Sequence, residues 1–230
     1  MNNKSITFFI LWFFGLSSSS VFAFEPCNSV ENQTICVNIS VKDYTGQSLE
    51  GMVVYLEPLD GQILQQSSKE VIIGQLGKSF TPYISVSQVN SKINFTNQDD
   101  ITHHIYSAGS DNKFSFKIRA GKTNSSTNFV KPSEVAMGCN IHDWMSGYLL
   151  IVDTPFFGKT NKLGQVSFAM NEKGKYKIVI WHPQMEEDSN RMISNEIING
   201  NTEFTYTLKN KMSEIPKQQS DDDFDFLSDY

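Results

Sequence analysis

Residues 138–147, G-C-N-I-H-D-W-M-S-G, place three metal-binding side chains within one short stretch. Cys139, His142 and Met145 stand at even spacings of three, so a single loop offers a thiolate, an imidazole and a thioether to one point. Copper takes such a set when Cys and two His bind strongly in a plane and Met binds weakly along the axis. This stretch therefore predicts a copper site that still needs a second histidine.

The second histidine has a source in residues 100–107, D-I-T-H-H-I-Y-S. Side chains alternate between the two faces of a strand, so His103 shares a face with Ile101 and Ile105, which points it toward a core. His104 falls on the opposite face, where we expect it beside the copper site or exposed, and it remains the alternative ligand. The predicted ligands of one copper ion are His103, Cys139, His142 and Met145.

Each of these residues has a plainer explanation when it is taken singly. A lone histidine on an apolar strand face is more often a hydrogen-bonded core residue, and a lone methionine is more often core filler. A lone thiol can be a small buried core residue. The combination of Cys-x2-His-x2-Met with an upstream histidine favours metal binding over these readings.

A thiolate and two imidazoles give copper a geometry that both Cu(I) and Cu(II) accept, which suits electron transfer. Groups around the Cys sulfur tune such a site, and the candidates are Asn97, His104 and Asn140. The whole chain has 4 histidines, too few for a second copper centre, and it carries no familiar hydrolase or nucleotide-binding motif. We therefore expect an electron carrier and no enzyme. The alternatives are a copper-binding or copper-delivery protein that uses the same residues, and a metal-free β-sandwich binding module.

Short alternating segments predict strands along the whole chain and no long helix. Apolar residues alternate with polar ones in residues 37–41, 114–118 and 204–208, and Gly, Asn and Asp turns separate such segments. This period of two is the mark of half-buried strands. The fold class expected from the pattern is all-β.

Two motifs resemble the cupredoxins, the family of plastocyanin, azurin and auracyanin. They are F-T-N-Q-D-D-I-T-H-H-I-Y-S at residues 95–107 and G-C-N-I-H-D-W-M at residues 138–145. With F-T-P at residues 80–82, they more closely resemble periplasmic plastocyanin-like proteins often labelled "methylamine utilization protein". The resemblance implies a cupredoxin-like Greek-key β-sandwich over residues 77–153. It also puts His103 in the family's His position and His104 in that of the Asn.

The ligand loop departs from the plastocyanin pattern in one respect. Plastocyanin-type loops have four residues between the loop His and Met, whereas this chain has two, Asp143 and Trp144. That spacing resembles the binuclear copper site of cytochrome oxidase, which needs a second Cys in the same loop. None is present here. A mononuclear site is therefore favoured.

The flanks of this module are similar to a second fold. Residues 41–56 resemble the first half of a carboxypeptidase-regulatory-like (transthyretin-like) β-sandwich, and residues 160–180 resemble its second half. The resemblance implies that residues 24–76 and 154–210 form one small sandwich, into which the cupredoxin-like module is inserted or against which it packs.

The first 23 residues have the pattern of a cleaved signal peptide. A positive start with Lys4, an apolar run at residues 6–16 and the small-x-small sequence at residues 21–23 form this pattern. The apolar run is too short to span a bilayer comfortably. We expect a mature chain that begins near Phe24 in the periplasm or outside the cell, without a transmembrane segment.

An oxidising compartment also decides how the cysteines are interpreted. Cys27 and Cys36 are nine residues apart near the expected mature N-terminus, and we predict a disulfide between them. Cys139 is then left over, and a metal ligand explains an odd thiol in a secreted protein.

The charge of the chain is concentrated at its C-terminus. The formal net charge is -6, and residues 214–230 contribute six acids against one lysine. A segment of residues 211–230 with many acids and little to bury is expected to be a disordered acidic tail. The nearly neutral remainder gives no reason to expect nucleic acid. The expected partners are redox proteins whose identity the sequence leaves open.

Overall fold

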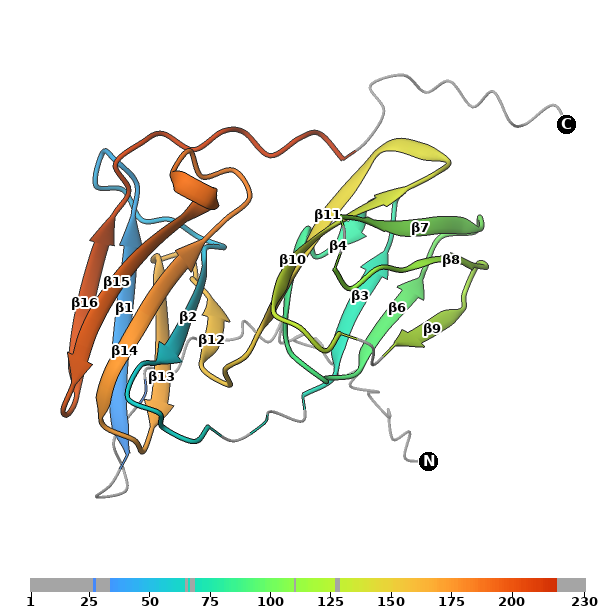
Figure 1. Ribbon diagram of the computed structural model, residues 1–230. Coiled ribbons are helices and arrows are strands. Elements are labelled where there is room, and N and C mark those ends of the chain that lie inside the picture. Colours follow the sequence, from blue (N-terminus) through green and yellow to red (C-terminus); the bar gives the residue numbers. More distant parts are fainter. Residues whose placement is uncertain are drawn as a thin grey trace, which may run out of the picture.

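The computed structural model describes residues 27, 34–64, 66, 69–109, 111–126 and 129–218. These residues form sixteen strands and one short 3-10 turn, Asp188–Asn190. The predicted all-β fold class is confirmed. The strands form two β-sandwiches that lie side by side (Figure 1). The expected signal peptide lies outside the described residues.

The first sandwich, which we call the flanking sandwich, combines strands from both ends of the chain. A three-stranded sheet, β13-β1-β16, faces a four-stranded sheet, β12-β2-β14-β15. Alternate residues of β1, such as Val37 and Ile39, point into its core, as the period of two predicted. Its strands are β1 (Ile35–Lys42), β2 (Val53–Pro58), β12 (Phe157–Lys159), β13 (Gln165–Met170), β14 (Gly174–Trp181), β15 (Arg191–Ile198) and β16 (Thr202–Thr207).

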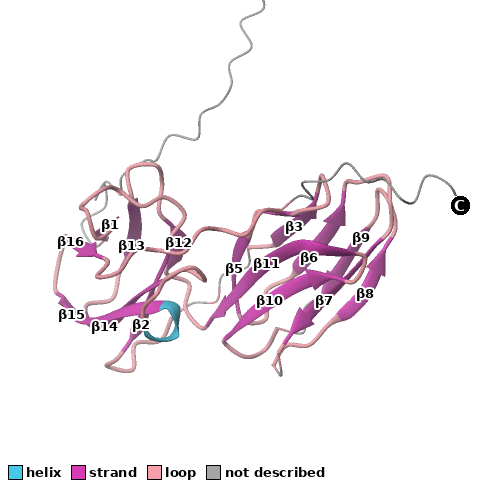
Figure 2. Cartoon of the chain, turned by 90° about the horizontal axis from the view of Figure 1, so that it is seen from above, coloured by secondary structure: helices cyan, strands magenta, loops and turns pink. Residues whose placement is uncertain are grey.

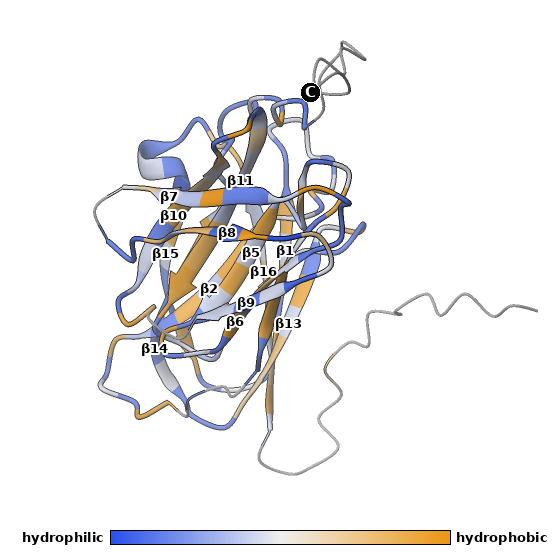
Figure 3. Cartoon of the chain, turned by 90° about the vertical axis from the view of Figure 1, so that its right-hand side faces the viewer, coloured by the Kyte–Doolittle hydropathy of each residue, from blue (hydrophilic) through white to orange (hydrophobic). Residues whose placement is uncertain are grey.

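The second sandwich, the inner sandwich, uses only strands that lie between β2 and β12 in the sequence. A five-stranded sheet, β5-β11-β10-β7-β8, faces a four-stranded sheet, β4-β3-β6-β9. Hydrophobic residues alternate with hydrophilic ones along several of its strands (Figure 3), and the buried ones form a single apolar cluster. Its strands are β3 (Val71–Gln75), β4 (Phe80–Thr81), β5 (Ile84–Gln88), β6 (Ile93–Asn97), β7 (His103–Ala108), β8 (Ser115–Ile118), β9 (Thr123–Ser126), β10 (Ser133–Cys139) and β11 (His142–Val152).

The end of strand β11, residues 149–152, is buried on both faces and joins the two sandwiches. Leu149 belongs to the core of the inner sandwich, whereas its neighbour Leu150 packs in a separate apolar cluster with Val53 and Trp181 of the flanking sandwich. A strand covered on both faces carries a continuous apolar run, which explains the sequence Y-L-L-I-V at residues 148–152. The two sandwiches, seen from above in Figure 2, therefore share a buried apolar interface.

Polar contacts at the edge of this interface fix the two sandwiches further. The Lys159 ammonium donates to the Ile84 carbonyl at 3.0 Å, and the Gln184 amide donates to the Tyr83 hydroxyl at 3.0 Å. Each pair joins a residue of the flanking sandwich or its loops to β5 or the turn before it. These contacts add directional restraint to the apolar packing.

The C-terminal segment, residues 211–218, also contacts both sandwiches, although we expected disorder from residue 211. The Ser213 N–H donates to the Gln184 carbonyl at 2.9 Å. At the other end, the Gln218 carbonyl accepts from the Ser79 hydroxyl at 2.7 Å, and its amide donates to the Ser146 hydroxyl at 3.1 Å. Main-chain groups and the side chains of Ser79, Ser146 and Gln218 form these bonds, which a composition argument does not detect. Residues 219–230 lie outside the described residues.

Two further expectations concern the disulfide and membrane-spanning segments. The predicted disulfide between Cys27 and Cys36 is present, and it is confirmed. In the part of the chain that the structure describes, no helix has the length and apolarity needed to cross a membrane.

Candidate metal centre

The hairpin of β10 and β11 holds two of the predicted ligands through an irregular register. Cys139 pairs directly with His142, but the next pair is Gly138 with Ser146, so residues 143–145 have no partner on β10. This shift interrupts the alternation of β11. As a result His142 and Met145, three residues apart, are both buried instead of facing opposite sides.

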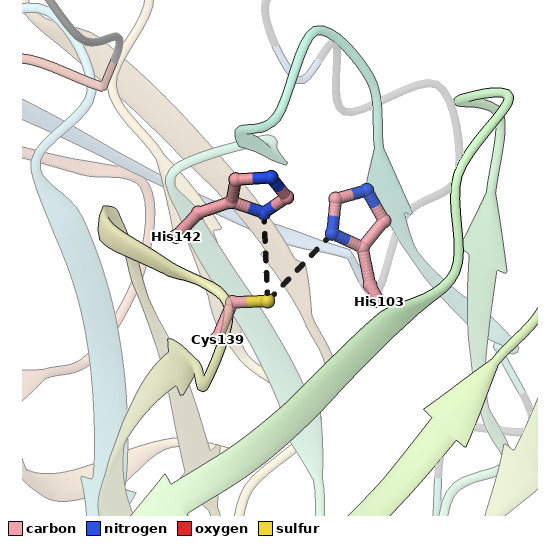
Figure 4. Close-up of side chains that lie close together, drawn as sticks. All are labelled: His103, Cys139 and His142. Carbon is pink, nitrogen blue, oxygen red and sulfur yellow. Dashed lines mark hydrogen bonds between the residues drawn. The ribbon is translucent and has the colours of Figure 1, made fainter. Parts of the chain in front are cut away.

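His103 reaches the same point from β7, the neighbouring strand of the sheet. Its Nδ1 lies 3.7 Å from the Cys139 Sγ, and the His142 Nδ1 lies 3.7 Å from the same sulfur (Figure 4). The ligand atoms of all three residues lie within 4.8 Å of one another. The side chains are almost fully covered, with exposed fractions of 0% for His103, 4% for Cys139 and 7% for His142.

These separations fit a single shared ion. With bonds of about 2.3 Å to sulfur and 2.0–2.1 Å to nitrogen at roughly tetrahedral to trigonal angles, the S···N distance is about 3.5–3.8 Å. Both observed S···N distances fall in that range. The donor set of one thiolate and two imidazoles is the one that copper accepts in trigonal sites. The three residues therefore fit the group that the sequence predicts.

The structure places the two upstream histidines on opposite sides of β7. His104 turns away from Cys139: its Nε2 lies 3.0 Å from the Ser115 hydroxyl, and its Nδ1 lies 2.9 Å from the Asn140 Nδ2. The Asn140 backbone N–H donates to the His104 carbonyl at 2.9 Å. The side chain of Asn140 thus braces His104 instead of lying beside the sulfur.

The other two predicted residues lie deeper in the inner sandwich. Asn97 is buried, and its amide donates to the carbonyls of Ile101 at 2.7 Å and Ile118 at 2.9 Å. It therefore holds the turn before β7. Met145 is buried in the same apolar cluster as Cys139, and its role as an axial ligand stays a prediction.

Hydrogen bonds to Cys139 favour its thiolate form. Burial raises the pKa of this thiol, but the contact with His103 and the backbone N–H groups of Ile141 and His104 outweigh burial, and the net pKa is lowered. His104 therefore acts on the sulfur through its main chain. Burial and the nearby charge of His103 lower the pKa of His142, which favours the neutral imidazole, the form that binds metals.

One residue at this site was missed from the sequence. The Asp99 carboxylate accepts a hydrogen bond from the His103 Nε2 at 2.7 Å. An acid four residues before a histidine was visible in the T-N-Q-D-D turn, but nothing in the pattern separated Asp99 from its neighbour Asp100. Only the packing of the turn against residues 77–78 selects Asp99.

Comparisons with known proteins return structural likeness alone. No protein-family model matches the chain, and no curated protein matches it. Among solved structures, a Cu-containing nitrite reductase (NirK) from Thermus scotoductus SA-01 is similar, with 22% identity, 42% of this chain and 25% of that chain covered, and a TM-score of 0.35. The matched part is thus a quarter of that enzyme's length.

Two smaller proteins are similar over nearly their whole length. A purple cupredoxin from Nitrosopumilus maritimus has 17% identity, 36% of this chain and 99% of that chain covered, and a TM-score of 0.33. An amicyanin variant in its oxidised state has 9% identity, 45% and 100% coverage, and a TM-score of 0.34. At these identities and scores, the assignment of the site rests on its residues and not on the likeness.

Proposed function

We propose that this protein is a mononuclear copper protein that transfers electrons. In this proposal His103, Cys139 and His142 would hold the ion, and Met145 would be a further, weaker donor. The observation that carries the proposal is the convergence of two imidazole Nδ1 atoms on one buried sulfur, each at 3.7 Å. Bound copper supplies a reversible one-electron couple at this point.

The residues that would hold the ion limit how far atoms must move when its oxidation state changes. Cys139 and His142 sit on one hairpin, and β7, which carries His103, is hydrogen-bonded to β10 beside Cys139. Because the three donors are assembled within one sheet, few atoms need to move when the charge changes. The burial of all three excludes water, which further reduces the reorganisation around the ion.

The route for electrons is proposed at the His142 end of the site. His142 has the largest exposed fraction of the three residues, and the adjacent Ile141 is 53% exposed. An apolar side chain beside a ligand gives a redox partner a surface on which to dock without strong charge. The partner's identity stays open, and the periplasmic or secreted location rests on the sequence of residues 1–23.

The flanking sandwich has a proposed supporting role. Its residues Val53 and Trp181 pack against Leu150 on the outer face of β11, the strand that begins with His142. We propose that this packing keeps the ligand hairpin rigid. If the inner sandwich expressed alone bound copper and exchanged electrons as well as the full chain, this role would be refuted.

The test is copper titration of the purified mature protein, followed by its visible spectrum and a redox titration. We expect one copper per chain, an intense thiolate-to-copper absorption band and a reversible one-electron couple. Copper that is bound weakly and surrendered readily to a chelator would favour delivery, and a protein that takes up no copper would favour a metal-free binding module.

The variant Cys139→Ser tests whether the Cys139 thiolate produces the absorption band. It should lose the absorption band completely, because the thiolate is removed. Its far-UV circular dichroism should stay that of the wild type, because serine only replaces a buried sulfur with a smaller oxygen. His182→Asn, which changes a buried histidine of the flanking sandwich, is the matched control and should keep the band. Retention of the band in Cys139→Ser would exclude the thiolate assignment.

A further inference from the structure

We propose that Asp99 is a positioning residue of the copper site, whose carboxylate orients His103 and whose charge favours the oxidised state of the ion. This inference rests on the proposed function, because it assigns a role toward the same ion. It concerns a carboxylate that lies behind the imidazole and does not face the metal position.

The orientation follows from the hydrogen bond between the two side chains. The Asp99 Oδ2 lies 2.7 Å from the His103 Nε2. An ionised carboxylate only accepts hydrogen bonds, so the proton of the imidazole must sit on Nε2. The lone pair is then on Nδ1, the nitrogen that lies 3.7 Å from the Cys139 sulfur. Such a carboxylate partner fixes both the tautomer and the ring orientation of a metal-binding histidine.

The carboxylate is itself held in place by the main chain. Its Oδ1 accepts from the Gly77 N–H at 2.6 Å, and its Oδ2 accepts from the Lys78 N–H at 3.0 Å. Gly77 and Lys78 both have a positive φ, of 63° and 58°. A lysine with a positive φ adopts a strained backbone, which costs free energy. The hydrogen bonds from the two N–H groups to Asp99 offset this cost. The side-chain Oδ1 of Asn97 also accepts from the Asp99 N–H at 2.9 Å.

These contacts keep Asp99 ionised although its side chain is only 10% exposed. Three donors, the Lys78 N–H, the Gly77 N–H and the His103 Nε2–H, point at its two oxygens, and hydrogen bonds to the charged form of a carboxyl favour that form. The site therefore holds two negative groups, the Cys139 thiolate and the Asp99 carboxylate. They neutralise Cu(II) but leave one negative charge in excess over Cu(I).

An excess charge in a buried site is unfavourable. The reduced state is therefore the one that Asp99 destabilises, and its charge lowers the reduction potential. The second imidazole, His142, has the ring of Trp144 beside it at a centroid distance of 5.3 Å. The two histidines are thus supported differently, one by a charge and one by an aromatic ring.

The experiment compares Asp99→Asn with Asp100→Asn in the full-length copper-loaded protein. Asp99→Asn removes the charge but leaves an amide oxygen that can accept from His103. We expect an unchanged copper content and absorption band, and a shift of the Cu(II)/Cu(I) equilibrium toward Cu(I) of at least tenfold, or about 59 mV in the potential. Asp100 is exposed, and its variant removes the same charge one residue away; its potential should change far less.

A second variant tests the orientation separately. Asp99→Ala removes the hydrogen bond as well as the charge, and copper affinity should fall about 10–100-fold. In the diamagnetic Cu(I) protein, the His103 Nε2–H should give a slowly exchanging nitrogen-15 NMR signal, which Asp99→Ala should lose.

The outcomes separate this inference from the proposed function. Equal potentials in Asp99→Asn and Asp100→Asn, or an Asp99→Ala protein with wild-type affinity and a protected His103 Nε2–H, would overturn the role of Asp99 while copper chemistry stands. A wild-type protein without a reversible copper couple would instead overturn the proposed function, and the role of Asp99 with it.

Discussion

The two sandwiches of this chain are built from the same kind of strand but differ in what their cores contain. The core of the flanking sandwich is a cluster of aliphatic, methionine and aromatic side chains. The core of the inner sandwich includes Cys139 and Met145, and His103 and His142 meet the sulfur. Similar apolar packing thus supports a plain structural module in one case and a candidate metal centre in the other.

Two buried histidines show the physical basis of this difference. His182, after β14 of the flanking sandwich, has its pKa lowered to about 4 by burial, and its Nδ1 accepts from the Gln184 N–H at 3.2 Å. Burial also acts to lower the pKa of His103, but its contacts with Cys139 and Asp99 outweigh burial and raise it. Burial alone favours the neutral form of a histidine, whereas partners such as Cys139 and Asp99 raise its pKa and orient its ring.

The largest expected effect is a loss of stability that leaves the copper site unchanged. Trp181→Ala removes a fully buried ring from the interface between the sandwiches and should lower the free energy of unfolding by about 3–5 kcal/mol. Urea unfolding measures this loss, and the copper absorption band at 25 °C should keep its position. Trp144→Ala is the counterpart at the site, and it should shift the band because its ring lies beside His142. A larger band shift in Trp181→Ala than in Trp144→Ala would break the comparison.

The next effect concerns acid stability. The folded pKa of His182 is about 4, below the ordinary value of 6.5, so the unfolded chain binds more protons between these values. Its contribution to stability is full above pH 6.5 and is lost as the pH falls toward 4, by about 3 kcal/mol at most. Urea unfolding of the apoprotein from pH 7 to 4.5 measures the loss. His182→Asn cannot titrate and should lose less over this range; identical profiles would show that His182 does not titrate as its burial implies.

The smallest effect tests the C-terminal segment that links the two sandwiches. Deletion of residues 219–230 should leave the melting temperature unchanged. Deletion of residues 212–230 also removes the hydrogen bonds to Gln184, Ser79 and Ser146, and should cost about 1–2 kcal/mol. Equal stability of the two truncated proteins would mean that residues 212–218 contribute nothing to either sandwich.

Local spacing suggested the residues of the candidate site, and the structure brings three of them together. Cys139 and His142 are close in sequence, and the period of two selected His103 over His104 before any contact was known. The same spacing could not show the irregular register that buries both His142 and Met145. Nor could it show the partners of Asn97 and Asn140, because the direction of an amide side chain depends on which groups the fold brings near it.

The sequence by itself determined the all-β class and the disulfide between Cys27 and Cys36, and it singled out the candidate donor residues of the predicted site. These features depend on side-chain alternation and residue chemistry, which act over a few positions. Only the tertiary structure decided that Asp99 supports His103, that the end of β11 is covered on both faces and that residues 211–218 contact both sandwiches. Each of these joins segments that packing, and not spacing along the chain, brings together.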